Sequence, residues 1–265
     1  MRIINVFANE TVLSRDTMKL LKRKLEKSDF VVPKEFDPNA ELIICIGGDG
    51  SFLETLHRYD FPTIPFIGIN TGHLGFFQEL HPDILDEFIF KYKHEKYEIQ
   101  DLKTVKADVT INGERFEYKG LNEIIIKGER SRTVHLNISI GDSFIERFSG
   151  DGILVATPAG STAYNYSVGG SIVDPRLSLL QVTPIAPMNT TAYRSFTSSI
   201  ILPPNLSIKI YPEHSAECGL LIVPDGMEFN HKGVDEINLE FSESVVRFLR
   251  FENYDFWYKV KSKFL

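Results

Sequence analysis

A Gly-Gly-Asp-Gly turn at residues 47–50 is the segment whose residue types most clearly indicate chemistry. It follows the apolar run Leu42–Ile46 and precedes a helical pattern, and glycine turns at such junctions bring backbone N–H groups close to phosphate. The turn has no lysine and carries Asp49 instead. Two like charges about 4 Å apart repel by ~4 kcal/mol at an effective dielectric of about 20, so an aspartate fits only beside a bridging cation or as the acceptor of a hydroxyl proton. The turn predicts phosphoryl transfer to an alcohol; a plain turn with a local Asx bond is the alternative.

A second polar loop, Gly68–Phe76, also comes directly after a strand pattern. Loops at the carboxyl ends of neighbouring parallel strands form a crevice. Asn70 and Thr71 can hydrogen-bond a ligand there, and His73 could donate to a phosphate, although a lone loop histidine is commonly structural. Residues of the two loops predicted to bind nucleotide are Gly48, Asp49, Gly50, His73, Leu74 and Phe76.

The pair Asn122-Glu123 precedes the β pattern Ile124–Ile126. An asparagine offers both a donor and an acceptor, which suits the edge of an adenine, and a glutamate suits ribose hydroxyls. An exposed start of a strand is the alternative interpretation of the same residues.

The longest polar segment runs from Gly150 to Gly170. Its Gly-Asp-Gly turn, with Asp151, leads into an apolar strand and then a run of small residues that opens a short helix, with Ser161 or Thr162 as the predicted N-cap. Small residues let a flat ligand approach the backbone, and Tyr164 and Tyr166 offer aromatic faces to a base. The alternative is a tight turn with core tyrosines.

Alternating strand and helix patterns over the first hundred residues predict a parallel sheet covered by helices. Ser51 with Glu54 three residues later predicts an N-terminal capping box for the helix Ser51–Arg58. The strands expected in this region are Arg2–Phe7, Glu41–Ile46 and Pro65–Ile69, and the other expected helices are Ser14–Lys27 and a segment from Pro82 to Tyr92.

Short strand patterns separated by turn signals follow after about Tyr97. Asn112-Gly113 predicts a two-residue hairpin, and Pro224-Asp225-Gly226 predicts a tight turn. Ile237–Phe241 and Ser244–Phe251 are expected as the last two antiparallel strands. We therefore predict an α/β nucleotide-binding domain over 1–98 and a β-rich domain over 99–251, with 252–265 able to return to the first domain.

The composition is that of an ordinary globular protein, with 265 residues, 43% hydrophobic residues and a formal net charge of −7. An acidic chain argues against a nucleic-acid binder. The sequence has no apolar run long enough to span a membrane, and no signal-peptide pattern follows Met1. We expect a cytoplasmic protein with neither nucleic-acid nor membrane partners.

The four polar segments together resemble the NAD kinase family. Its motifs are Gly-Gly-Asp-Gly, an Asn-Glu pair, and Gly-Asp-Gly followed by Thr-Pro-x-Gly-Ser-Thr-Ala-Tyr and Ser-x-Gly-Gly, which here span Ile43 to Gly170. Phosphofructokinases and lipid kinases share the first motif, whereas the last is typical of NAD kinases. The resemblance implies a Rossmann-like N-terminal domain, a mostly-β C-terminal domain, an active site between them, and a homotetramer or homodimer.

Residue roles follow from the same resemblance. It implies that Asp49 is the general base on the 2′-hydroxyl of the adenosine ribose, that Asn122 and Glu123 contact adenosine, and that Asp151 contacts the nicotinamide half. It further implies a dinucleotide pocket lined by Thr162, Ala163, Tyr164, Asn165 and Ser167, with a backbone contact at Ala186. Asp225 resembles a position that approaches the nucleotide in some members of the family. Ser149 stands where many members carry a basic residue, and we include it among the predicted binding residues.

The predicted reaction is phosphorylation of NAD to NADP, with ATP or polyphosphate as donor and Mg²⁺ or another divalent cation held through the phosphates. Two other functions stay open on the sequence. One is a lipid or sphingoid kinase that shares the glycine turn, and the other is a non-catalytic dinucleotide sensor on the same fold.

Overall fold

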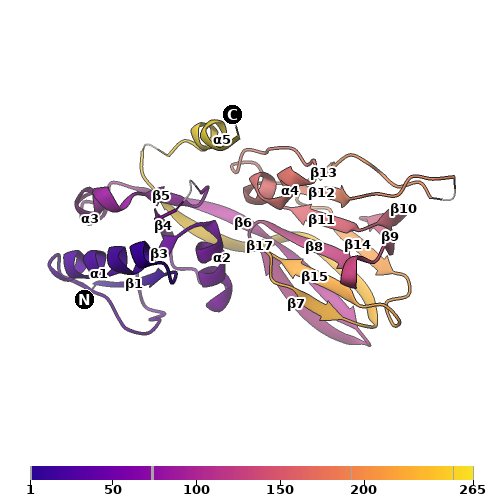
Figure 1. Ribbon diagram of the computed structural model, residues 1–265, viewed down its shortest axis with the longest axis horizontal. Coiled ribbons are helices and arrows are strands. Elements are labelled where there is room, and N and C mark those ends of the chain that lie inside the picture. The colour runs from indigo at the N-terminus through magenta and orange to yellow at the C-terminus, as the bar shows by residue number, and fades with distance from the viewer. Residues whose placement is uncertain (1, 73–74, 192, 253, 265) are drawn as a thin grey trace. The chain divides into compact units, whose positions relative to one another are not determined.

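The computed structural model describes residues 2–72, 75–191, 193–252 and 254–264 (Figure 1). The chain forms two compact units. Unit 1 comprises Met1–Leu102 with Val245–Leu265, and unit 2 comprises Lys103–Ser244. The chain leaves unit 1 along β6 (Glu98–Ile111) and returns to it along β17 (Val234–Arg250). The C-terminal helix α5 (Phe256–Phe264) therefore belongs to unit 1.

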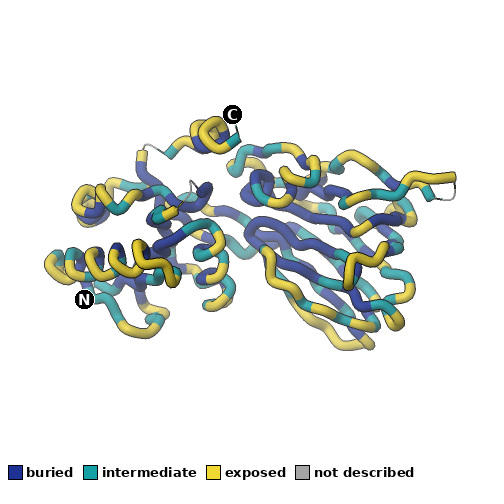
Figure 2. Tube along the Cα trace, viewed as in Figure 1, coloured by how far each residue is buried: buried dark blue, intermediate teal, exposed yellow. Residues whose placement is uncertain are grey.

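Unit 1 contains a parallel sheet in the order β2-β1-β3-β4-β17, with β5 beside β4. Its middle strand β3, with sequence Leu-Ile-Ile-Cys-Ile-Gly, is buried along its whole length (Figure 2), as expected for a parallel strand covered on both faces. The strands are β1 (Arg2–Ala8), β2 (Phe30–Val31), β3 (Leu42–Gly47), β4 (Phe66–Asn70) and β5 (Gln78–Leu80), and the helices are α1 (Val12–Glu26), α2 (Asp49–Arg58), η1 (Pro82–Ile84), α3 (Leu85–Lys93) and α5.

Helix α1 packs on this sheet through residues at helical spacing, Thr17, Leu21 and Leu25. Its N-cap is Thr11, whose hydroxyl accepts a hydrogen bond from the Ser14 amide at 3.3 Å. Helix α2 begins at Asp49, two residues earlier than the sequence indicates, with Gly48 as a cap that has no side-chain bond. The capping box predicted from Ser51 and Glu54 is thus wrong.

The side chains of that predicted capping box have other partners. The Ser51 hydroxyl accepts a hydrogen bond from Asn9 Nδ2 at 3.2 Å. Glu54 forms an exposed ion pair with Arg58 one turn later on α2. The glycine turn lets the helix start directly from the strand end, and it therefore places Asp49 in the first helical turn.

Unit 2 is built from two antiparallel sheets whose facing side chains form one core. One sheet has the order β13-β12-β11-β8-β15-β16, and the other contains β10-β9-β14-β17 with β6 and β7. Facing aliphatic side chains such as Ile126, Val155, Ile210 and Leu239 fill the space between them. The strands are β7 (Glu114–Gly120), β8 (Glu123–Gly128), β9 (Val134–Ile140), β10 (Ser143–Gly150), β11 (Gly152–Ala156), β12 (Leu180–Ile185), β13 (Ile200–Leu202), β14 (Ile208–Pro212), β15 (Leu220–Pro224) and β16 (Phe229–His231), with short helices η2 (Glu129–Ser131), η3 (Ala159–Thr162) and α4 (Tyr164–Ser167).

The predicted turns of unit 2 are confirmed. β6 and β7 pair across Asn112-Gly113, and both turn residues have positive φ, +48° and +83°, as a type I′ hairpin requires. Asp225 and Gly226 also have positive φ. The last two predicted strands are instead one, because β17 runs without interruption from Val234 to Arg250. The polar residues Ser242 and Glu243, which separate the two predicted strands, lie within this strand.

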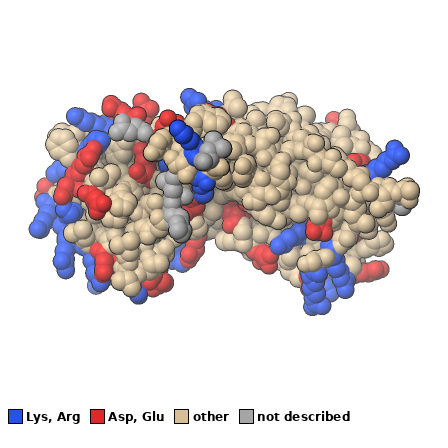
Figure 3. Space-filling view, turned by 45° about the horizontal axis from the view of Figure 1, so that its top comes forward, with Lys and Arg blue, Asp and Glu red and all other residues tan. Residues whose placement is uncertain are grey.

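The surface of unit 1 is charged, and the helices of the chain are short. Lysine, arginine, aspartate and glutamate side chains are interspersed over the face of unit 1 that Figure 3 shows. None of the helices in the described part of the chain is both long enough and apolar enough to cross a membrane.

Candidate active site

The Asp49 carboxylate is held by two consecutive backbone amides. Oδ2 accepts a hydrogen bond from Phe76 N and Oδ1 accepts one from Phe77 N, each at 3.0 Å. Asp49 comes from the start of α2 and the two amides from the loop that leads into β5. Its side chain remains 27% exposed. A carboxylate offers about four acceptor directions, so two bonds to amides leave capacity for a hydroxyl.

Gly75 makes this approach of Asp49 possible. A Cβ at position 75 would collide with the Gln78 amide oxygen and would lie only 2.5 Å from Asp49 Oδ1. Gly48 and Gly50 have no such neighbour, because a Cβ at either position would meet nothing within 4 Å, and neither has positive φ. The fold therefore does not itself require glycine at 48 and 50, and the open space above them is available to a ligand.

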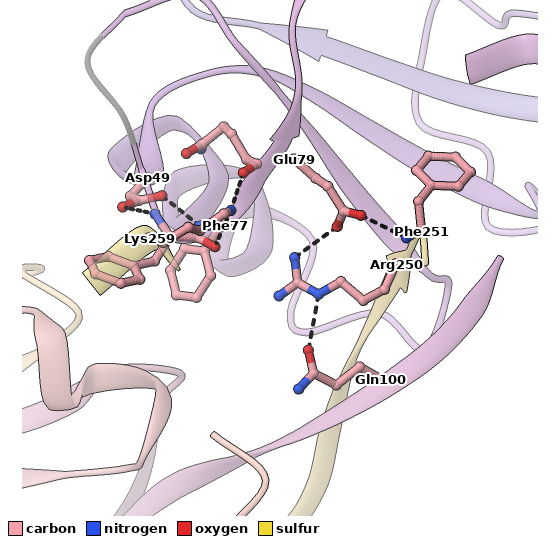
Figure 4. A network of polar contacts seen from close by, with 9 residues as sticks. Asp49, Phe77, Glu79, Gln100, Arg250, Phe251 and Lys259 are labelled. Atoms are coloured by element: carbon pink, nitrogen blue, oxygen red, sulfur yellow. Dashed lines mark hydrogen bonds and ion pairs between the residues drawn. The ribbon is translucent and has the colours of Figure 1, made fainter. Parts of the chain in front are cut away.

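Two lysines of α5 lie at this loop. Lys259 is 9% exposed, and its Nζ donates to the carbonyls of Phe76, at 3.1 Å, and Gln78. Burial lowers the pKa of Lys259 to about 8. Lys263 lies 3.9 Å from Asp49 Oδ2 and covers the ring of Phe76. Figure 4 shows Lys259 and Asp49 approaching the same strand start from two elements.

A cavity of about 330 Å³ lies beside α2, at the carboxyl ends of β1 and β3. β2 and β3 lie on opposite sides of β1, which makes this a topological switch point, the usual ligand crevice of an open α/β sheet. The carboxylates of Glu10 and Glu54 line the cavity, and Arg58, which also lines it, is paired with Glu54. This charge balance disfavours an anion, so we place no phosphate there.

In unit 2, Asp225 organises the Asn122-Glu123 turn. Its carboxylate accepts hydrogen bonds from the amides of Leu121 at 2.8 Å, Asn122 at 2.7 Å and Glu123 at 3.3 Å. On the other side, the Asn122 carbonyl accepts a bond from Thr157 N at 2.9 Å. A Cβ on Gly160 would collide with the Asn122 backbone. The third and fourth polar segments of the sequence therefore meet at Asn122.

Asn122 and Glu123 are buried, 7% and 5% exposed, so the alternative of an exposed start of a strand is wrong. Asn122 Oδ1 and Glu123 Oε2 are buried without a hydrogen-bond partner. Burial, with a smaller contribution from the Asp225 carboxylate, raises the pKa of Glu123 to about 8. Buried polar atoms normally have partners, so these two oxygens have unused capacity to accept a hydrogen bond.

The segment after β11 has a different local structure from the one predicted. Neither Ser161 nor Thr162 is an N-cap, because Pro158 precedes η3 and Ala163 precedes α4, both without a side-chain cap bond. The Ser161 hydroxyl instead accepts a bond from Val173 N at 3.0 Å and fixes the following loop. Tyr164 and Tyr166 are 44% and 42% exposed, so the core-tyrosine alternative is also wrong.

The other predicted binding residues of the segment after β11 differ in how far their side chains are exposed to solvent. Thr162 is buried and Ser167 is exposed. Asn165 is fully buried, with Oδ1 bonded to the Thr183 hydroxyl at 2.7 Å and Nδ2 near the Ser161 and Ser171 carbonyls. Both ends of the Asn165 amide are thus engaged within the protein, which indicates that it braces the loop.

Ser149, Asp151 and Ala186 lie near one another at the ends of β10 and β12. Ser149 is fully buried and its hydroxyl contacts His135 Nδ1 at 2.8 Å. Asp151 is exposed, and its amide donates to Ile185 O at 3.0 Å. Ala186 is exposed with a φ of +43°. A non-glycine residue in the left-handed region costs about 1 kcal/mol or more and is common at functional sites.

Two predicted residues, His73 and Leu74, lie outside the described residues. Sequence reasoning missed Lys259 and Gln78, whose two amide atoms are buried without a partner beside Asp49. No motif marks either residue; the only signal for the lysine was the aromatic and basic character of the C-terminal segment. Within the described ranges, no group of three or more His, Cys, Asp or Glu side chains is placed to hold a metal ion.

The two-unit fold and the carboxylate in the glycine turn are those of a class of kinases that have the Gly-Gly-Asp-Gly motif. Comparison with known proteins shows which family of this class the chain belongs to. The family model described as the ATP-NAD kinase N-terminal domain matches residues 8–97, and the ATP-NAD kinase C-terminal domain matches residues 121–251. An NAD kinase of Finegoldia magna is 40% identical over all of this chain and 98% of its own length. An NAD kinase of Lactobacillus johnsonii is 34% identical over 97% of this chain and 95% of its own.

Solved structures agree with this fold. A yeast NADH kinase complexed with NADH superposes with a TM-score of 0.85 at 20% identity and covers 99% of this chain and 87% of its own. An NAD kinase from Archaeoglobus fulgidus in complex with ATP gives 0.78 at 25% identity over 99% of both chains. The chain belongs to the NAD kinase family. It is an enzyme that phosphorylates NAD to NADP, so the lipid-kinase and sensor alternatives no longer apply.

Proposed function

We propose that Asp49 is the general base of this reaction and takes the proton of the 2′-hydroxyl of the adenosine ribose. The observation that carries the proposal is the pair of 3.0 Å bonds from Phe76 N and Phe77 N. They fix the carboxylate in one orientation while part of it stays exposed. A ribose hydroxyl is a weak nucleophile, and a positioned base contributes ~10²–10⁴-fold to such a step.

Adenosine recognition is assigned to Asn122 and Glu123. Their orphaned oxygens, Oδ1 and Oε2, need partners, and the amino group of adenine and the hydroxyls of ribose can supply donors to both. Because the pKa of Glu123 lies at about 8, the side chain is protonated at neutral pH and can also donate. Gly160 lets the backbone of η3 approach this pair closely.

The other half of the dinucleotide is assigned to exposed groups of unit 2. Asp151 is proposed to contact the nicotinamide carboxamide, and the strained backbone at Ala186 to offer a carbonyl or amide. Thr162, Ala163, Tyr164 and Ser167 are proposed to line the pocket, with the exposed ring of Tyr164 against a base. Asn165 and Ser149 act behind this surface, because their hydrogen bonds are internal.

ATP is the proposed donor, which agrees with the ATP complex of the Archaeoglobus fulgidus relative. Gly48 and Gly50 leave open space at the N-terminus of α2, where amides can receive phosphate. A divalent cation would neutralise phosphate charge when bound, and we propose that the phosphates of the substrates hold it. A cytoplasmic homodimer or homotetramer remains a proposal from the family resemblance.

The test is the Asp49→Asn variant, assayed with NAD, Mg²⁺ and either ATP or polyphosphate. NADP is followed with a coupled NADP-specific dehydrogenase. We expect turnover to fall by at least ~100-fold while calorimetry shows that NAD still binds. Asp16→Asn, at an exposed position of α1, is the matched control and should be fully active. Near-normal turnover of Asp49→Asn would remove Asp49 from the role of base.

A further inference from the structure

The peptide group between Phe76 and Phe77 connects Lys259 to Asp49. Its carbonyl oxygen, from Phe76, accepts a hydrogen bond from Lys259 Nζ at 3.1 Å. Its N–H, from Phe77, donates to Asp49 Oδ1 at 3.0 Å. A peptide group is planar and does not rotate internally. The position of the lysine ammonium therefore sets the direction in which that N–H points toward the carboxylate (Figure 4).

A second bond from the same ammonium prevents this peptide from tilting. Lys259 Nζ also donates to the carbonyl of Gln78, two residues further along the chain. Gln78 begins β5, which is anchored against Gly68 of β4. The ammonium thus holds two of the three carbonyls of the 76–78 segment, whose amides at Phe76 and Phe77 hold Asp49. A hydrogen-bonded chain from cation through peptide to carboxylate is also mutually polarising.

Aromatic packing fixes the helix that carries Lys259. The Phe76 ring lies 5.9 Å from the ring of Phe256 and 5.9 Å from that of Phe264. These two residues flank Lys259 on the buried face of α5. The loop that holds Asp49 and the helix that supplies the ammonium are therefore one packed unit.

A purely structural role would be better served by an apolar side chain. Burying an ammonium is costly, and replacing buried charges by well-packed apolar groups is often neutral or stabilising. Lys259 is 9% exposed and has no carboxylate within ion-pair distance among the described residues. Its ammonium instead donates hydrogen bonds to two carbonyls of the segment that orients Asp49.

We infer that Lys259 is a positioning residue for phosphoryl transfer, which acts by holding the 76–78 segment so that its amides aim the Asp49 carboxylate. This inference rests on the proposed role of Asp49 as base. It assigns a function in the reaction to the C-terminal helix α5, which lies outside all four sequence motifs.

The charged groups around Lys259 make its role depend on pH. Burial, with smaller contributions from the cations Arg250 and Lys263, lowers its pKa to about 8, and the carboxylates Glu79 and Asp49 oppose this shift. The ring of Tyr254 also lies 5.2 Å from Nζ. Above pH 8 the neutral amine still has two N–H donors but loses charge assistance, which roughly halves the strength of such bonds. Turnover should therefore decline on the alkaline side.

The contribution of Lys259 to the free energy of unfolding should change with pH in the opposite direction to turnover. This difference distinguishes a positioning role from a purely structural one. Between pH 8 and the ordinary value of 10.5, the unfolded chain binds more protons at this lysine than the folded one. The contribution of Lys259 to the free energy of unfolding therefore rises with pH in this window. If turnover falls above pH 8 while the contribution of Lys259 to the free energy of unfolding does not, the lysine acts by positioning Asp49 and not by stabilising the fold.

The test compares Lys259→Met with Lys261→Met, an exposed lysine of the same helix, from pH 6 to 10. We expect Lys259→Met to lower kcat about 10- to 100-fold, as misplacement of a catalytic group does, to leave KM for NAD within about twofold, and to lose the alkaline decline near pH 8. Lys261→Met should match the unsubstituted enzyme in all three. An unchanged kcat and pH profile in Lys259→Met would overturn the inference.

Two further measurements keep the result decisive. If Lys259→Met does not fold, the pH profile is measured in the Glu123→Gln variant, which removes the other group whose pKa lies at about 8: an alkaline decline of kcat with a midpoint near pH 8 and no loss of thermal stability above pH 8 supports the inference, and a flat profile to pH 9.5 overturns it. Asp49→Asn is assayed in parallel. Full activity there would remove the proposed base, whereas a loss there with an unaffected Lys259→Met would reject the positioning role alone.

Discussion

Asp225 Oδ1 accepts a hydrogen bond from Asn122 N at 2.7 Å, across 103 residues of sequence. The same carboxylate also serves the amides of Leu121 and Glu123. Asp225→Ala would leave these amides without their acceptor, at about 1–3 kcal/mol for each buried one. We expect KM for NAD to rise more than kcat falls, because the turn that presents Asn122 and Glu123 would loosen. Steady-state kinetics with NAD varied at saturating ATP measures both.

Glu228→Ala is the control for this substitution. Glu228 lies three residues from Asp225 and forms an exposed ion pair with Lys127, which is worth about 0–1 kcal/mol. It should leave both kinetic constants unchanged. An unaltered KM in Asp225→Ala would show that the turn keeps its shape without the carboxylate.

Glu123 should make stability fall as pH rises. Its pKa in the folded protein is about 8 against an ordinary 4.5, so between these values the folded state binds more protons than the unfolded state. The free energy of unfolding that Glu123 contributes therefore decreases with pH by up to ~1.4 kcal/mol per unit. Glu123→Gln should remove this decrease. Urea denaturation at pH 6 and pH 8 measures it, and an identical pH dependence in both proteins would be evidence against a buried, protonated Glu123.

Gly50→Ala tests whether the open space at the start of α2 belongs to a ligand. A Cβ at this position would meet nothing within 4 Å, and alanine is up to ~1 kcal/mol more favourable than glycine in a helix. The free energy of unfolding should therefore stay the same or increase. Activity should nevertheless fall, because the methyl group would occupy space proposed for phosphate.

Thermal denaturation and the coupled assay on the same Gly50→Ala sample separate these effects. A stable variant with reduced activity is the expected result. A variant that is stable and fully active would show that no substrate group approaches Gly50.

Local signals predicted much of the fold. The buried β3, the Asn112-Gly113 hairpin and the Asp225-Gly226 turn each follow from residues that are adjacent in sequence. The start of α2 was misplaced because a serine three residues before a glutamate resembles a capping box, whereas the glycine turn already allows the helix to begin at Asp49. β17 was divided because the polar residues around Ser242 resemble a turn, although a strand exposed on one face also tolerates them.

The site was predictable only where its residues lie in motifs. Asp49, Asn122 and Glu123 stand in short patterns whose chemistry can be argued from residue type. The segment that aims Asp49 depends on Lys259, 210 positions away, and no periodicity or spacing encodes that contact. The internal roles of Ser149 and Asn165 likewise depend on distant partners, His135 being 14 and Thr183 being 18 positions away.

A crystal structure of this enzyme with NAD bound tests the central assignment most directly. We expect the 2′-oxygen of the adenosine ribose within roughly 3.2 Å of an Asp49 carboxylate oxygen, with Phe76 N and Phe77 N still bonded to that carboxylate. NAD bound with its adenosine ribose out of hydrogen-bond reach of Asp49 would contradict it.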